Sequence, residues 1–246
     1  MFRSALAWLA VAVYHTVVLS SRKRFAFFRE SSPHMSQPIT LDALDLTALV
    51  CSRVCHDVIS PVGAIVNGLE VLADEKDEKM KEVALDLIRK SAIQASARLQ
   101  FARLAFGAAG SAGAQIDLGD AAEVAKGFFA DERLKLVWNL PRVLLPKNRV
   151  KLLLNLLLIA ATAIPRGGTL TVDPVGDGEA MGFRLRAEGT NARIPPKAEA
   201  LLAGTPAESL DAHVIQPYYA GLLARAAGLK VSIAVEGDGI ALLATL

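Results

Sequence analysis

Hydrophobic residues recur at alternating intervals of four and three positions in the segment that follows Met35. The repeating positions, which we call the seam, are Leu44, Ala48, Cys51, Cys55, Val58, Val62, Ile65, Leu69 and Leu72. This heptad spacing predicts an amphipathic helix over residues 41 to 73, with Thr40 as its N-cap. A second helical pattern follows the charged stretch at 74–79 and extends to about residue 106. Together the two segments predict a helical hairpin over residues 40–107.

The periodicity changes after a run of small residues, GAAGSAGA, at 107–114. Its composition is typical of a flexible linker, to which we assign residues 108–116. The two GDG sequences at 176–178 and 237–239 are typical of hairpin turns. Beyond the linker the pattern predicts strands at 134–138, 169–173, 183–187, 231–235 and 240–244, and helices at 119–129, 147–164, 196–203 and 214–227. Residues 117–246 therefore predict a second domain with an α+β fold, in which helices pack on one face of a mixed sheet.

Residues 1–34 do not continue either pattern. They hold five of the 27 basic residues and one of the 25 acidic residues, and an apolar run at 5–21 precedes a basic cluster at 22–24. Such a segment fits a weak membrane anchor, a signal peptide, or sequence upstream of the native start. We expect the last of these, because the amphipathic pattern begins directly after Met35. We therefore treat residues 1–34 as an extension outside the fold.

The composition of the remaining chain excludes some classes of function. Residues 35–246 hold 22 basic and 24 acidic side chains. This slightly acidic balance argues against a nucleic-acid binder, because such proteins depend on basic contacts to phosphates. Two cysteines make no disulfide framework, and a cytoplasmic location is expected.

Both cysteines precede a histidine in the stretch CSRVCHDVISPVG, at 51–63. Covalent haem attachment requires C-x-x-C-H, whereas this spacing is C-x-x-x-C-H. A zinc site requires four ligands, and Cys51 and Cys55 both lie in the seam, where small apolar side chains are buried. We therefore expect buried cysteines, no bound metal and no cofactor held by this chain.

His56 follows Cys55 and lies about 100° around the helix from the seam, so we expect it to be exposed. The same sector contains Arg53, Ser60, Ala64 and Asn67. Asp57 is adjacent and can orient the imidazole. Pro61 lacks a backbone donor, so the helix should bend just after His56.

The sequence HDVISPVG resembles the phosphoacceptor motif of two-component signalling, an H-[DE]-x-x-[ST]-P core on the first helix of a dimerising hairpin. The second helix has a matching apolar spacing, at Ala84, Ile88, Ala92, Ala95, Leu99, Ala102 and Phe106. The resemblance implies that two hairpins form a dimeric four-helix bundle.

The second domain resembles the ATP-binding domain of histidine kinases, an α/β sandwich, but its nucleotide motifs are altered. In the segment at 147–172, Asn155 matches the first asparagine of the kinase motif, whereas Ile159 replaces the asparagine that binds magnesium. Isoleucine has no oxygen to offer a hard cation. No D-x-G-x-G sequence occurs between 183 and 200, and the bulky segment HVIQPYYAGLLARAAG, at 213–228, replaces the glycine-rich phosphate loop. The resemblance therefore implies a domain that binds no ATP.

A phosphorylatable histidine on a dimerising hairpin, joined to a degenerate kinase domain, resembles the ChpT-type histidine phosphotransferases of alphaproteobacterial phosphorelays. HDVISPVG, NGLEVL at 67–72 and VIQPYYAGLLAR at 214–225 carry this resemblance over roughly residues 40–246. It implies a cytoplasmic homodimer acting in a phosphorelay, of the kind found in cell-cycle regulation. His56 would take a phosphoryl group from the receiver domain of a hybrid histidine kinase and pass it to a downstream response regulator, with Mg²⁺ supplied by the receiver.

The resemblance assigns roles to the residues around His56. Asp57 would orient the imidazole and take its proton, and Ser60 would donate a hydrogen bond or position water. Arg53 would hold phosphoryl oxygens, and Ala64 and Asn67 would contact the docked receiver. Two alternatives stay open, namely an ATP-dependent sensor-type histidine kinase and a non-catalytic dimeric signalling scaffold.

Overall fold

Two long helices form the predicted hairpin in the computed structural model of the protein, which describes residues 40–107, 113–130, 133–204, 210–212 and 214–246. Helix α2 spans Ala43–Asp74 and α3 spans Glu78–Ala105. Asp42 caps α2, because its carboxylate accepts from the backbone N–H groups of Leu44 and Asp45 at 2.8 Å each. The prediction of Thr40 as the N-cap was wrong by two residues, since the Asp42 carboxylate chelates the first free amides. The extension at 1–34 lies outside the described residues.

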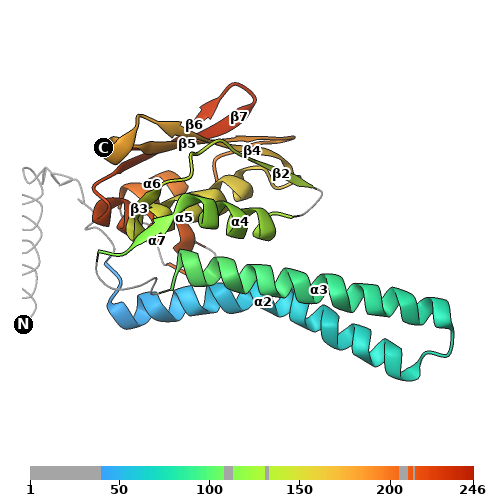
Figure 1. Ribbon diagram of the computed structural model, residues 1–246. Helices are drawn as coiled ribbons and strands as arrows, with labels where there is room; N and C mark the ends of the chain where they lie inside the picture. The colour runs from blue at the N-terminus through green and yellow to red at the C-terminus, as the bar shows by residue number, and fades with distance from the viewer. Residues whose placement is uncertain (1–39, 108–112, 131–132, 205–209, 213) are drawn as a thin grey trace, which may run out of the picture. The chain divides into compact units, whose positions relative to one another are not determined.

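Few residues of α2 are fully buried within one chain. These residues are Pro61 and Gly68, which are seven positions apart and so lie on one face of the helix. Gly68 allows close approach, because a Cβ at this position would lie 2.6 Å from the Cγ1 atom of Ile88. Gly63 faces open space, where an added Cβ meets nothing within 4 Å. The axis of α2 changes direction about midway along its length, in agreement with the predicted bend at Pro61 (Figure 1).

The rest of the described chain forms a mixed sheet with helices. All five predicted strands and four predicted helices are present, and two three-residue strands, β1 and β3, were too short to predict from periodicity. In chain order the elements are β1 (Gln115–Asp117), α4 (Leu118–Phe128), β2 (Leu134–Trp138), β3 (Leu144–Pro146), α5 (Lys147–Ala163), β4 (Gly168–Val175), the 3₁₀ turn η1 (Gly178–Ala180), β5 (Gly182–Glu188), α6 (Ala198–Ala203), α7 (Ile215–Ala226), β6 (Lys230–Glu236) and β7 (Gly239–Thr245).

The five-stranded sheet has the order β2-β4-β5-β7-β6. Strand β2 pairs in parallel with β4, and the other neighbours are antiparallel, so the sheet is mixed. Gly176 and Gly237 adopt positive φ in the turns after β4 and β6, as the GDG sequences predict. The helices lie on one face of this sheet (Figure 1). Burial alternates along β5, where Phe183, Leu185 and Ala187 face the helices.

The hydrophobic core of the sheet continues into the hairpin. Phe101 and Ala105 of α3 are fully buried members of the same cluster as the α5 leucines. The ring of Phe101 packs against Phe128 and Phe129, at centroid distances of 4.3 and 6.2 Å. The carboxyl end of α3 is therefore part of the core of the second domain.

Helix α7 contacts the residues just before α2 and just after α3, at the two ends of the hairpin. The hydroxyl of Tyr218 accepts from the backbone N–H of Leu41, just before α2, at 3.2 Å. The ring of Tyr219 packs against Phe106, just after α3, with centroids 5.6 Å apart. Burial raises the pKa of the Tyr219 hydroxyl. Two adjacent tyrosines thus contact the two ends of one hairpin.

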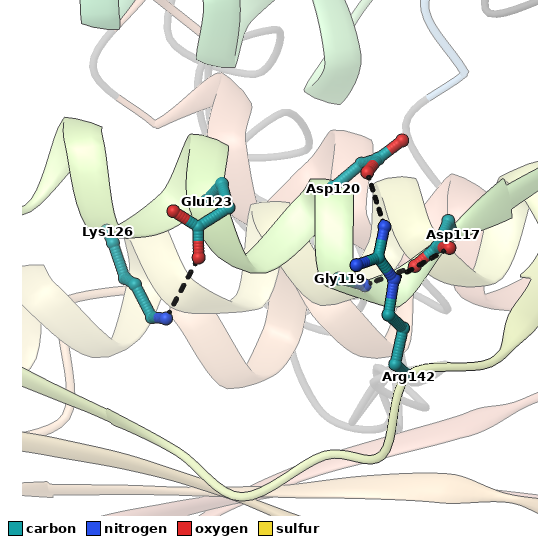
Figure 2. Close-up of polar contacts among 6 residues, drawn as sticks. All are labelled: Asp117, Gly119, Asp120, Glu123, Lys126 and Arg142. Carbon is teal, nitrogen blue, oxygen red and sulfur yellow. Dashed lines mark hydrogen bonds and ion pairs between the residues drawn. The ribbon is translucent and has the colours of Figure 1, made fainter.

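An ion-pair cluster ties the loop after β2 to the start of α4 (Figure 2). The carboxylate of Asp117 caps α4 by accepting from the Gly119 N–H at 2.6 Å, and it accepts from Arg142 Nε at 3.1 Å. Arg142 also lies 3.4 Å from Asp120 Oδ1. The hydrogen bond from Arg142 is the main cause that lowers the pKa of Asp117. The cluster thus joins the N-terminus of α4 to the loop between β2 and β3.

The two glycines of α2 provide a matched test of the hairpin packing. Gly63→Ala should raise the free energy of unfolding by about 0.5–1 kcal/mol, because alanine favours helix and space is open there. Gly68→Ala should lower it by about 1–3 kcal/mol, because Ile88 must move. Denaturant unfolding of both variants measures the difference. Equal stabilities would contradict the close contact at Gly68.

Candidate functional site

His56 lies on the exposed surface of α2, as its position off the seam predicts. Its side chain is 66% exposed, and Nδ1 lies 3.4 Å from Oδ1 of Asp57. This contact favours the tautomer with the proton on Nδ1, which leaves the lone pair on Nε2. The contact is long for a hydrogen bond, as is common in sites that tighten only when the reactant is bound.

Asp57 is held by groups on both sides. Its second oxygen, Oδ2, accepts from Nε of Arg53 at 3.1 Å, one helical turn earlier. Arg53 is therefore turned toward Asp57, with a side chain 19% exposed, and does not point outward with His56 as we predicted. The reason is the favourable pairing of opposite charges four residues apart on a helix.

The sequence analysis missed one residue of this site, Arg98 on α3. Its guanidinium donates to the backbone carbonyl of Asp57, across 41 residues of chain. The long separation in sequence hides this contact. Pro61 gives one signal of it, because proline has no N–H to donate to the carbonyl of Asp57, four residues earlier, and a buried carbonyl needs another donor.

The other predicted site residues lie on or near the His56 face. Ser60 and Asn67 are exposed, one turn and three turns beyond His56. Ala64 is half-buried, so it is less exposed than its predicted position in the sector of His56 implies. Gly63, with open space in front of it, is the small residue that leaves room on this face.

Most seam residues of α2 are exposed to solvent in a single chain. Cys51 and Cys55 are exposed, so the prediction of buried cysteines does not hold for a single chain. Leu44 is 81% exposed and Leu69 is 54% exposed. Three further apolar residues of α2 are exposed beside them, at Ile59, Val62 and Val66. This row forms an apolar stripe along one side of α2, and His56 lies at the edge of that stripe next to Ile59.

Helix α5 carries the residues that correspond to the kinase asparagine motif. Ile159 is 1% exposed and belongs to the hydrophobic core. Asn155 is fully buried, and its Nδ2 donates to the carbonyl oxygens of Lys151 at 2.7 Å and of Ala105 at 3.2 Å. Burial, together with the charge of Lys147, lowers the pKa of Lys151. Ile159 has no side-chain oxygen for a metal, and Oδ1 of Asn155 is engaged by Gln216.

Helix α7 lies in the segment that we predict to replace the kinase phosphate loop, and its side chains are packed. Gln216 is buried and donates to Oδ1 of Asn155, and Tyr218 belongs to a second apolar cluster with Leu201 and Ile215. A cavity of about 970 Å³ lies between the β1–β3 pair and the β4–β5 turn, and none of these residues lines it. Nor do any three His, Cys, Asp or Glu residues among the described positions gather as metal ligands.

The chain is similar to known phosphotransferases. Residues 118–239 match the family model of the histidine phosphotransferase C-terminal domain. The chain is 56% identical to the protein phosphotransferase ChpT of Brucella abortus (strain 2308) over 207 residues, which cover 84% of this chain and 98% of that protein. It also matches the 1.7 Å structure of a bacterial phosphotransferase, with a TM-score of 0.77 and 53% identity over 84% of this chain and 98% of the other.

A more distant structural match is the histidine kinase AdeS of Acinetobacter baumannii, with a TM-score of 0.40 and 12% identity over 78% of this chain and 96% of that one. The identity to ChpT, by contrast, extends over nearly the whole length of the relative and includes the hairpin that carries His56. On this basis the chain belongs to the ChpT family of histidine phosphotransferases.

Proposed function

We propose that His56 is the phosphoryl carrier of a phosphorelay, taking a phosphoryl group from the aspartyl phosphate of one receiver domain and passing it to the aspartate of a downstream response regulator. The observation that carries the proposal is the exposed imidazole of His56, whose Nδ1 faces the Asp57 carboxylate. That carboxylate is in turn fixed by Arg53. The arrangement directs Nε2 toward an incoming partner.

The transfer itself balances without a further reactant. The lone pair on Nε2 of His56 forms the N–P bond while the bond from phosphorus to the receiver's carboxylate oxygen breaks, and that carboxylate keeps the electron pair. The imidazole becomes cationic, and its Nδ1 proton is stabilised by Asp57 or passes to it. The aspartate of the second receiver then reverses these steps. Positioning and charge stabilisation do most of the work in such transfers.

The receiver would dock on the His56 face of α2. Ser60 and Asn67 are exposed there, and Gly63 leaves room for close approach. The Mg²⁺ that neutralises phosphoryl oxygens would come with the acidic pocket of the receiver, since Ile159 cannot bind a cation in this chain. Arg53, turned toward Asp57, supports that carboxylate in this scheme.

We further propose that the second domain binds no ATP. Buried Ile159 and the amide pair of Asn155 and Gln216 fill the positions that resemble the kinase nucleotide motifs. The side chains of α7 pack on α5 and on the hairpin ends, where a kinase would use backbone amides.

A cytoplasmic homodimer is proposed from the apolar stripe of α2. By length and composition α2 is also long and apolar enough to cross a membrane. However, Arg53, Asp57 and Glu70 lie within it, and the apolar residues gather on one side as in a helical bundle. A second copy of the hairpin would cover that side and form a four-helix bundle.

His56→Gln should abolish phosphoryl transfer, because glutamine keeps the bulk and polarity of the side chain but offers no nucleophilic imidazole. Its stability should change by less than about 0.5 kcal/mol, since the site is exposed. Acid-labile label on the chain after mixing with a phosphorylated receiver measures the transfer. His213→Gln is the matched control and should transfer normally. Label retained on the His56→Gln chain, or no label on the wild-type chain, would contradict the proposal, the latter favouring a scaffold.

Titration calorimetry should detect no binding of Mg-ATP at millimolar concentration, because core side chains occupy the nucleotide positions. Incubation with labelled ATP alone should leave the chain unlabelled. Micromolar affinity, or label on His56 from ATP, would place the protein among the sensor-type kinases.

Leu69→Glu should convert the dimer to monomers or insoluble chain, because it places a charge in the proposed bundle core. Val71→Glu is the matched control: Val71 is also exposed but lies about 200° around the helix from Leu69. Light scattering should show a dimer for the wild type and for Val71→Glu. A monomeric wild type would rule out the bundle.

A further inference from the structure

Pro61 leaves a gap in the hydrogen bonding of α2 at the turn that carries the candidate site. In an α-helix the carbonyl of residue 57 accepts from the N–H of residue 61, and proline has no N–H. The ring of proline also presses against that carbonyl and tilts it away from the helix axis. The affected carbonyl is that of Asp57, the residue beside His56.

Arg98 supplies the missing donor from the neighbouring helix. Its guanidinium donates to this carbonyl, and both residues are partly buried between α2 and α3. A carbonyl left without a partner in such a place is unfavourable, and a charged donor forms one of the stronger hydrogen bonds available. Pro61 itself is buried, and it lies seven residues from Gly68 on the face of α2 that meets Ile88 of α3, so the gap is on the side of the helix that fills it.

We propose that Arg98 is a positioning residue for phosphoryl transfer: it replaces the backbone donor lost at Pro61 and fixes the turn of His56 and Asp57 against α3. This inference rests on the proposed role of His56. Arg53 holds the carboxylate of Asp57 and Arg98 holds its backbone, so the group that orients the imidazole is fixed at both ends. Pro61 and Arg98 therefore act together, because one removes a donor to the carbonyl of Asp57 and the other supplies it.

A double-mutant cycle of Arg98→Met and Pro61→Ala tests whether the effect of Arg98 depends on the missing N–H at position 61. Alanine at position 61 restores the backbone N–H, so the carbonyl of Asp57 no longer needs Arg98. Arg98→Met alone should slow transfer from a phosphorylated receiver by about ten- to a hundredfold, with the KM for the receiver nearly unchanged. In the Pro61→Ala background the same change should slow transfer less than about twofold. Arg98→Lys, which keeps a donor, should retain intermediate activity.

Arg89→Met is the matched control, since Arg89 is an exposed arginine of the same helix and should not affect transfer. Equal slowing by Arg98→Met in both backgrounds, or none in either, would overturn the proposal. Thermal unfolding of the four cycle variants adds a second readout that does not depend on transfer. Arg98→Met should lower the melting temperature of the wild-type chain, and it should lower that of the Pro61→Ala variant much less. If wild type is never labelled, His56 is not the carrier, but the melting data still decide whether Arg98 serves the carbonyl.

Discussion

The buried amide of Asn155 connects the three parts of the structure on which the site depends. It donates to the carbonyl of Ala105 at the end of the hairpin and accepts from Gln216 of α7, while it lies in the middle of α5. Tyr218 and Tyr219 hold the two ends of the hairpin from the same helix α7. Because buried amides must be paired, these contacts fix the hairpin to the sheet domain at its open end and leave the rest of α2 to carry His56.

This connection explains how a domain that resembles a kinase catalytic domain can serve a phosphotransferase. In the histidine kinases that this domain resembles, the corresponding segments bind nucleotide. Here the same segments form core and hairpin contacts, through Ile159 and the tyrosines of α7. In the function proposed above, the chemistry is confined to the His56 face of α2, and the partner brings both the phosphoryl group and the metal.

Much of this fold follows from periodicity, because each long element buries one face. The hairpin, all five main strands and the exposure of His56 could be predicted, whereas β1 and β3, three residues each, carry too little pattern. The spacing of residues does not reveal the N-cap or the orientation of Arg53. The N-cap depends on which side chain reaches the free backbone amides of α2, and the orientation of Arg53 depends on its pairing with Asp57. The contact of Arg98 with Asp57 depends on the register of two helices, which only the folded hairpin defines. The exposed cysteines show that a heptad pattern identifies a face to be covered without identifying the chain that covers it.

The burial of Ile159 also constrains how the protein can evolve. Restoring an asparagine there would place an unpaired amide in a core position that is 1% exposed, at a cost of about 1–3 kcal/mol. That change would bring no benefit until the α7 segment had lost its tyrosines and regained glycines, and those tyrosines now hold the hairpin. Each step back toward a nucleotide site would thus weaken the fold before any ligand could bind. Single substitutions toward the kinase motif therefore each carry a cost in stability, because the same side chains that depart from that motif now form the core and the hairpin contacts.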